Sequence, residues 1–520
     1  MAWRGSRGAS SHNSRENIPA KFDFDLTVAI RKESSVNEHR PGSFIAGISP
    51  ASSRGGPTDP TNSFPSSPEH ACMTVTIAER LADWVSETSA IPGEVQLSTA
   101  KCVFDLMSAA VAGYQTPSAI AMRQTANMTW GSGPAAIWFS GDRSTPVGAT
   151  FVNATCACSL DLDDGHRAAS GHPGAAIIPA VFAMLNTSSL DARRTLVAIA
   201  LGYEIGVRIS SSRDLKRIPT VNSGLWCGQA VAAAIGKVRG LSPTQIAHAI
   251  SIAGTTSPSQ SATPYTRYRG NNVKEGIPWG AANGILAVNL AEQGFTGPID
   301  ILDCAERYNP ARLLNGLGAS WLINKTYFKP YSCCRWIHAP VDALLALMAE
   351  HDIRSGEIIA IDVETFGRTL TLSNEVAPVT LEGAQYSVPF CLGVAATSGA
   401  SALLPLGEES LANASALDIA LRVRMTVTPE FDTMFPAAVP GRIRVTTASG
   451  VFERTVLTPK GEPANPMSWE EIDSKFQTIA AGRVGACFAG GIRSAIGALR
   501  TGDITALKSM LEARVFPGPD

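Results

Sequence analysis

Five side chains that can carry protons or orient a proton carrier lie close together in the middle of the chain. The segment LDLDDGHRAASGHPG holds three carboxylates and two imidazoles, namely Asp161, Asp163, Asp164, His166 and His172. Imidazoles titrate near neutral pH, and general acid–base catalysis needs such groups side by side. Apolar segments with helical spacing flank the turn at 149–160 and 175–185. We therefore expect a junction between two helices that can hold a pocket.

Two further segments combine basic side chains with helix starts. They are RYRGNNVKEGIPW, with Arg269 and Lys274, and KPYSCCRWIHAPVD, with Lys329, Arg335 and His338. Cations beside the free amides of a helix start favour a carboxylate ligand. The second segment lies where the helical pattern of the first domain gives way to the mixed helix and strand pattern of the next, and pockets are common at domain junctions. Both segments are candidates for binding an anionic ligand.

Each of these patterns has a plainer alternative. Asp and Gly are ordinary residues of a solvated capping loop, and His338 could simply fix a helix start. Glu204 and Arg208, four residues apart, are expected to form an ion pair within a helix. Adjacent cysteines, as in Cys333 and Cys334, rarely give the spacing that a metal needs. The DxDD pattern at 161–164 also resembles the general-acid motif of class II terpene cyclases, but an aromatic content of 7% argues against such a carbocation pocket.

Composition excludes several classes of protein. The 520 residues carry a formal net charge of −2, which gives no electrostatic reason to expect nucleic acid or an anionic membrane surface as a partner. No run of about 18 apolar residues predicts a transmembrane helix. The ten cysteines show no repeated CxxC spacing, so reduced thiols and no metal site are expected. We expect a cytoplasmic protein, and an Arg- and Ser-bearing start leaves a mitochondrial signal open.

The fold is expected to be mainly α, with a large helical domain and an inserted smaller α+β domain. Residues 1–72 are rich in Ser, Pro, Gly, Arg and Asn and predict a disordered extension. Residues 73–324 show helical spacing throughout. Residues 325–466 contain β-branched runs that predict strands at 358–366, 417–427, 442–447 and 451–458. Residues 467–520 return to helical spacing and should pack on the first domain.

Several motifs together resemble the MmgE/PrpD family, which includes 2-methylcitrate dehydratase, cis-aconitate decarboxylase and iminodisuccinate epimerase. They are TVTIAERLADWV, LDLDDGHRAASGHPGAA, GYEIGVRI, NNVKEGIPWGAANG, GFTGPIDIL and KPYSCCRWIHAPVDAL. They are spread over about residues 73–513, nearly the whole predicted fold. The resemblance implies a helical domain with an α+β lid, an active site between them, no cofactor, and a homodimer.

The resemblance also implies roles for individual residues. Asp161, His172 and Lys274 would be catalytic, with His172 exchanging a proton under the orienting influence of Asp161 or Asp164. The residues expected to bind the substrate are Lys329, Arg269, Arg335, His338 and Asp164. The sequence departs from cis-aconitate decarboxylases at three places. Gly165 replaces a threonine, no histidine lies near Val221, and Phe390 stands where those enzymes have a tyrosine.

These features predict a cofactor-independent lyase that acts on a small di- or tricarboxylic acid. The short HPG turn resembles the decarboxylase branch more than the dehydratase, whose corresponding loop is longer. We therefore expect decarboxylation of an aconitate or alkyl-aconitate substrate, in fungal-type secondary metabolism. A 2-methylcitrate or alkylcitrate dehydratase, an epimerase and a catalytically silent helical scaffold are the alternatives.

Overall fold

The computed structural model describes residues 75–215, 217–258, 271 and 273–516. All of these residues belong to one compact unit, Cys72–Asp520. The predicted disordered extension, 1–72, and Arg269 lie outside the described residues.

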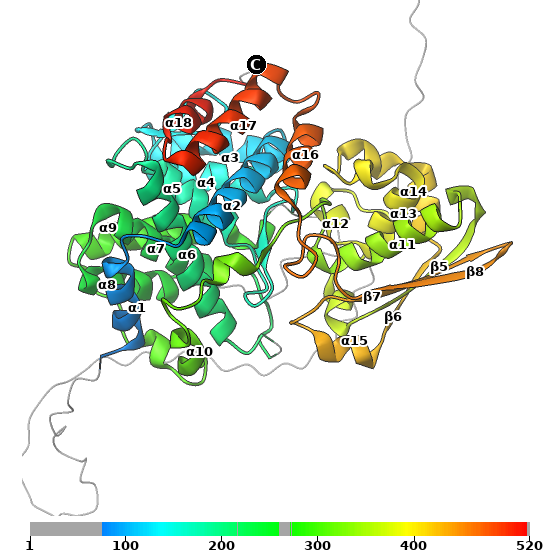
Figure 1. The fold of residues 1–520 in the computed structure, drawn as a ribbon, viewed down its shortest axis with the longest axis horizontal. Helices are drawn as coiled ribbons and strands as arrows, with labels where there is room; N and C mark the ends of the chain where they lie inside the picture. Colours follow the sequence, from blue (N-terminus) through cyan, green and yellow to red (C-terminus); the bar gives the residue numbers. More distant parts are fainter. Residues whose placement is uncertain (1–74, 216, 259–270, 272, 517–520) are drawn as a thin grey trace, which may run out of the picture. The chain divides into compact units, whose positions relative to one another are not determined.

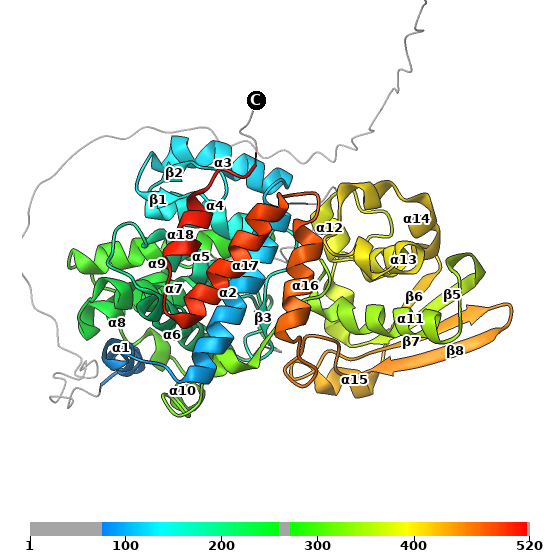
Figure 2. The ribbon, with the colours of Figure 1, turned by 45° about the horizontal axis from the view of Figure 1, so that its top comes forward.

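Helices from both ends of the described chain share one hydrophobic core and form a helical part (Figure 1). Its helices are α1 (Ile77–Glu87), α2 (Gly93–Gly113), α3 (Pro117–Trp130), α4 (Pro146–Cys158), α5 (Gly174–Ala183), α6 (Ala192–Ser212), α7 (Gly224–Arg239), α8 (Pro243–Thr255), α9 (Ile277–Glu292) and α10 (Pro310–Leu314), followed near the C-terminus by α16 (Trp469–Ala480), α17 (Ala486–Thr501) and α18 (Thr505–Glu512). The last helices return to this core, with α16 and α17 packed against α2 (Figure 2).

Local signals in the sequence begin these helices and set how closely they pack. Side chains at five helix starts accept a hydrogen bond from a main-chain amide of the first turn: Thr76, Thr116, Thr145, Asp191 and Ser242. Helices α7 and α9 touch through glycines. A Cβ on Gly284 would lie 2.5 Å from the carbonyl oxygen of Gly228. The small residues of the sequence therefore permit an approach that alanine would block.

A second hydrophobic core supports an α+β part. Its helices are α11 (His338–Glu350), α12 (Leu381–Gln385), α13 (Val388–Ser398), α14 (Ala414–Ala420) and α15 (Pro429–Met434), and its strands are β5 (Ile358–Thr365), β6 (Val423–Val427), β7 (Gly441–Thr447) and β8 (Gly450–Val456). The strand order is β6-β5-β7-β8, with β5 and β6 parallel and the other pairs antiparallel. Helix α11 packs against β7 and β8 (Figure 2).

One predicted strand is wrong in its first half. The segment 417–427 contains the end of α14 before β6 begins at Val423. Asn413 caps α14 by accepting a hydrogen bond from the Ala416 amide, and Ala416, Ile419 and Ala420 are buried at helical spacing. The cap and the alanine content outweigh the one β-branched residue of this half, Ile419.

Short strands tie the acidic turn to the basic segment that follows the helical part. Strand β3 (Gly165–His166) pairs with β4 (Thr326–Tyr327), and Gly165 lies opposite Tyr327. A Cβ on Gly165 would lie 2.2 Å from the Tyr327 hydroxyl oxygen, so the tyrosine ring requires glycine at this position. A separate pair joins β1 (Ala135–Ala136) to β2 (Arg143–Ser144).

The prediction of a mainly α fold is confirmed. The domain boundaries at 73–324, 325–466 and 467–520, and the role of the α+β part as a lid, stay predictions. In the described part of the chain, no helix combines the length and the apolar character that crossing a bilayer requires.

Candidate active site

Asp161 is the centre of the candidate site. It follows α4, is buried, and has a positive φ of 53°, a conformation that is strained for a residue other than glycine. Its carboxylate accepts a hydrogen bond from Nζ of Lys329 at 2.7 Å and another from Nζ of Lys274. The Lys329 ammonium also donates to the main-chain oxygen of Asp161 at 3.0 Å. Two ammonium groups from distant segments thus meet at one buried carboxylate.

A tight left-handed turn positions Lys274 directly before α9. Lys274, Glu275 and Gly276 have φ values of 46°, 56° and 68°. From this turn the Lys274 ammonium also donates to the Tyr386 hydroxyl at 2.7 Å, and that hydroxyl lies 3.4 Å from Oε1 of Glu275. Strained backbone of this kind persists only when its surroundings hold it in place, and it is concentrated at functional sites.

His172 completes the cluster, and its surroundings define its tautomer. Nδ1 lies 2.8 Å from the main-chain oxygen of Asp164. Because a carbonyl oxygen only accepts, Nδ1 carries the hydrogen. The other ring nitrogen, Nε2, lies 3.8 Å from Oδ1 of Asp161. The main-chain amide of His172 donates to Oγ of Ser223, which in turn donates to Glu275 at 3.0 Å.

Charges around the cluster set its protonation states. Burial alone would raise the pKa of Asp161, but the Lys274 and Lys329 ammonium groups outweigh it and lower the pKa strongly. Burial would lower the pKa of Lys274, and the Asp161 carboxylate reverses that effect and raises it. For His172, burial and Lys329 lower the pKa, whereas Asp163 and Glu275 raise it by more, so the net pKa is raised. The resting cluster therefore holds an anionic Asp161, a cationic Lys274 and an imidazole that binds its proton more tightly than a free one.

The other residues predicted for the site lie around this centre with partners of their own. The Asp164 carboxylate accepts from the Tyr203 hydroxyl at 2.5 Å and from the Gly174 amide at 3.1 Å. Burial raises the pKa of Asp164 to about 7. The Asp164 side chain is thus engaged by Tyr203 and Gly174, and it is the main-chain oxygen of Asp164 that contacts His172.

Arg335 and His338 form a neighbouring buried pair. The Arg335 guanidinium donates to Glu462 at 2.9 Å, to the carbonyls of Lys460 and Pro459, and to Nδ1 of His338. The other His338 nitrogen lies 3.2 Å from the Cys333 carbonyl. Burial and Arg335 hold the pKa of His338 far below its usual range, so this imidazole is neutral. Substrate binding by Arg335 and His338 stays a prediction.

His166, the second imidazole of the acidic turn, points elsewhere. Its Nε2 lies 3.0 Å from the Leu322 carbonyl, and burial lowers its pKa to about 4. Glu204 and Arg208 form the predicted ion pair within α6 at 2.8 Å. His166, Glu204 and Arg208 therefore make structural contacts and are not members of the cluster at Asp161.

The sequence did not reveal three members of the cluster, which are Ser223, Glu275 and Tyr386, and it gave Asp163 of the acidic turn no role of its own. Ser223 lies two residues from Val221, in the segment where a histidine was expected and not found. Tyr386 supplies a hydroxyl to the site, whereas Phe390, one helical turn later, is buried in the core of the α+β part. Tyr386 directly precedes Ser387, the N-cap of α13, and this local position carries no signal of a role in the site.

The cluster is a poor match to a metal site. Asp161, Asp163 and His172 each offer one atom within 4.8 Å of the others. However, the ammonium groups of Lys274 and Lys329 already contact Asp161. A divalent cation there would face two fixed positive charges.

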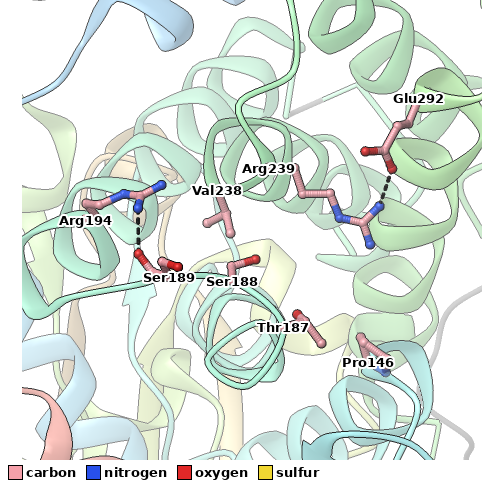
Figure 3. Close-up of a pocket in the computed structure, with 8 residues that line it drawn as sticks. All are labelled: Pro146, Thr187, Ser188, Ser189, Arg194, Val238, Arg239 and Glu292. Atoms are coloured by element: carbon pink, nitrogen blue, oxygen red, sulfur yellow. Dashed lines mark hydrogen bonds and ion pairs between the residues drawn. The ribbon is translucent and has the colours of Figure 1, made fainter.

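A hollow on the helical part is unrelated to this cluster (Figure 3). Its volume is about 580 Å³. Its cations are already engaged, because Arg239 pairs with Glu292 at 2.7 Å and Arg194 donates to the Ser189 carbonyl at 2.5 Å (Figure 3). None of the predicted site residues that the structure describes lines this hollow.

A mainly helical chain with a buried carboxylate, two ammonium groups and an imidazole has the parts of an acid–base enzyme for anionic substrates. Residues 79–311 match the model of the MmgE/PrpD N-terminal domain, and residues 331–493 match that of the MmgE/PrpD C-terminal domain. The chain belongs to the MmgE/PrpD family, which confirms the resemblance found in its motifs.

Relatives within the family are consistent with one branch. The chain is 25% identical over 445 residues to cis-aconitate decarboxylase of Aspergillus terreus strain NIH 2624 / FGSC A1156, covering 78% of this chain and 89% of the relative. It is 25% identical over 458 residues to the cis-aconitate decarboxylase-like protein oryM of Aspergillus oryzae, covering 78% and 92%. Human cis-aconitate decarboxylase is 24% identical over 370 residues, covering 66% and 75%. The chain is therefore a lyase, and its similarity supports the decarboxylase-like branch of the family.

Proposed function

We propose that the chain is a cofactor-independent decarboxylase that acts on cis-aconitate or a close alkyl analogue. The observation that carries this proposal is the meeting of two ammonium groups and an imidazole at the buried carboxylate of Asp161. Such a cluster can bind a carboxylate, stabilise a developing negative charge and deliver a proton. The names of the relatives supply the substrate class.

Lys274 and Lys329 bind a substrate carboxylate in this proposal. An ammonium group has three hydrogens to donate. Lys274 donates to Asp161 and Tyr386, and Lys329 donates twice to Asp161. Each ammonium thus keeps one donor for a ligand without breaking its contact with Asp161.

The chemical step then needs one proton and no cofactor. The bond between the substrate carbon and its departing carboxylate breaks, CO₂ leaves, and the electron pair stays on the substrate. The remaining carboxylates, held by the two lysines, spread this charge in a water-poor site. Nε2 of the His172 imidazolium delivers the proton to carbon, and a proton from solvent restores the imidazolium. The raised pKa of His172 favours this acid form at neutral pH.

The test is turnover followed by NMR with ¹³C-labelled cis-aconitate, together with 2-methylcitrate, alkylcitrates and iminodisuccinate. The proposal expects labelled CO₂ and a product with one carboxylate fewer. His172→Ala should lower this turnover by about two to four orders of magnitude, whereas His351→Ala, an exposed histidine of the α+β part, should not. Addition or loss of water without CO₂ would instead identify a dehydratase. Inversion of a substrate centre would identify an epimerase. Homodimer formation and a role in fungal-type secondary metabolism stay predictions.

A further inference from the structure

A large cavity lies beside the acidic turn, separate from the cluster at Asp161. Its volume is about 1080 Å³. Its lining includes residues 211–215 from the end of α6 onward, 436–439 after α15, and 457–459 after β8. Small-molecule sites typically enclose about 300 to 1,000 Å³. The cavity is therefore larger than a six-carbon acid requires.

Arg213 gives the lining a cation that has no acidic partner among the described residues. Its guanidinium donates only to Ser210, to Oγ at 2.6 Å and to the carbonyl at 3.3 Å, and it forms no ion pair within the described part of the chain. A guanidinium has five N–H donors. Burial lowers the pKa of Arg213 to about 10, so it remains charged at neutral pH. Arg167, another cation of the lining, already pairs with Glu462 at 2.6 Å, and the lining also contains Arg312 and Lys325.

Part of the lining is apolar. It includes Pro436, Ala437, Ala438 and Val439, with Leu457 from the chain after β8. Leu457 is 49% exposed, so its apolar surface is open to a ligand. Basic and apolar side chains thus line one cavity.

We propose that this cavity binds a molecule with a carboxylate at one end and an apolar chain at the other. The carboxylate pairs with the free N–H groups of Arg213, and the chain lies along the apolar lining from Pro436 to Val439. Guanidinium and carboxylate form a two-point, charge-assisted contact. Burial of the chain removes apolar surface of both partners from water.

The cavity is also connected to the catalytic turn. Ser210, which accepts the hydrogen bond from Arg213, donates its own hydrogen to the Ala169 carbonyl at 2.8 Å. Ala169 lies in the turn that carries His172. The ligand can therefore be the alkyl end of the substrate itself or a separate amphiphilic acid. The cavity is tested by ligand binding and the decarboxylase proposal by turnover. Either proposal can therefore fail while the other stands.

The experiment measures binding of octanoate to the full-length protein by calorimetry, with acetate and octylamine as comparisons. Octanoate should bind, and both other probes should bind at least about tenfold more weakly because one lacks the chain and the other the negative charge. Arg213→Gln should weaken octanoate binding by at least about tenfold. The matched control is Arg194→Gln, an exposed arginine of the unrelated hollow in Figure 3, which should leave binding unchanged.

A second variant keeps the test decisive if Arg213→Gln fails to fold. Ala438→Trp retains Arg213 and fills the apolar part of the lining, so it should also abolish octanoate binding. Competition by an alkyl aconitate but not by cis-aconitate would identify the ligand as the substrate's own chain, and octanoate binding that is independent of both would identify a separate acid. Parental affinity in both variants, or equal affinity for octanoate and octylamine, would overturn the proposal.

Discussion

Replacing Asp163 with asparagine should lower the pKa of His172. Oδ2 of Asp163 lies 3.3 Å from Nδ1 of His172. At this distance two unit charges interact by about 1 kcal/mol in water and by about 5 kcal/mol at an effective dielectric constant of about 20. Since one pKa unit corresponds to about 1.4 kcal/mol, loss of the charge should lower the pKa by about 1 to 4 units. The hydrogen bond from Nδ1 to the Asp164 carbonyl keeps the ring in place.

The assay is the pH dependence of kcat, together with an NMR titration of the His172 ring. Activity that needs the imidazolium is lost as pH rises through the His172 pKa, so Asp163→Asn should move the alkaline limb to lower pH. Asp164→Asn is the matched control, because its main-chain carbonyl still holds His172 while its side chain contacts Tyr203 and Gly174. An unchanged limb in Asp163→Asn, with a shifted limb in Asp164→Asn, would refute the assigned roles of these two carboxylates.

Three other perturbations test separate parts of the structure. Lys274→Met should lower kcat/KM by about 30-fold to a few thousand-fold, since loss of a buried charge partner costs about 2 to 5 kcal/mol; steady-state kinetics at the parental level would contradict a role for this lysine. His166 has a pKa of about 4 when folded against 6.5 as the reference. The unfolded chain therefore gains a proton first as pH falls, and about 3 kcal/mol of stability should be lost between these values. His166→Gln should remove that loss in urea unfolding at several pH values. Dialysis against a strong chelator should leave turnover intact, and recovery by one divalent ion after a loss would instead make Asp161 a metal ligand.

The sequence could predict much of the centre of the site because its residues are local or carry a recognisable motif. Asp161 and His172 fall in one short turn, Lys274 and Lys329 lie in two basic segments next to helix starts, and the family resemblance gave these lysines their roles. Tyr386 could not be placed in the same way, because more than a hundred residues separate it from its partner Lys274. No spacing rule links positions so far apart; only the packing of the α+β part against the helical part does.

The sequence predicted which charged residues lie near the site better than it predicted which of them pair with one another. The sequence presents Arg335 as a free cation, yet the structure pairs it with Glu462, which lies 127 residues away. It likewise presents Asp164 as a side chain that orients His172, yet the main-chain carbonyl makes that contact. Composition and periodicity indicate which elements form. They do not indicate which of several nearby charges neutralise one another, because that depends on distances set by the tertiary fold.

The charges of the resting cluster explain how binding and proton delivery can be coupled. Lys274 and Lys329 contact the carboxylate of Asp161, and the His172 ring lies 3.3 Å from Asp163, so cationic and anionic groups already meet around the ring before a ligand arrives. An anionic substrate adds negative charge close to His172, which raises its pKa further and keeps the proton on the ring. Departure of CO₂ then leaves a carbanion that is a far stronger base than the imidazole. On the proposed mechanism, the ligand's own charge therefore holds the proton in readiness until carbon can accept it.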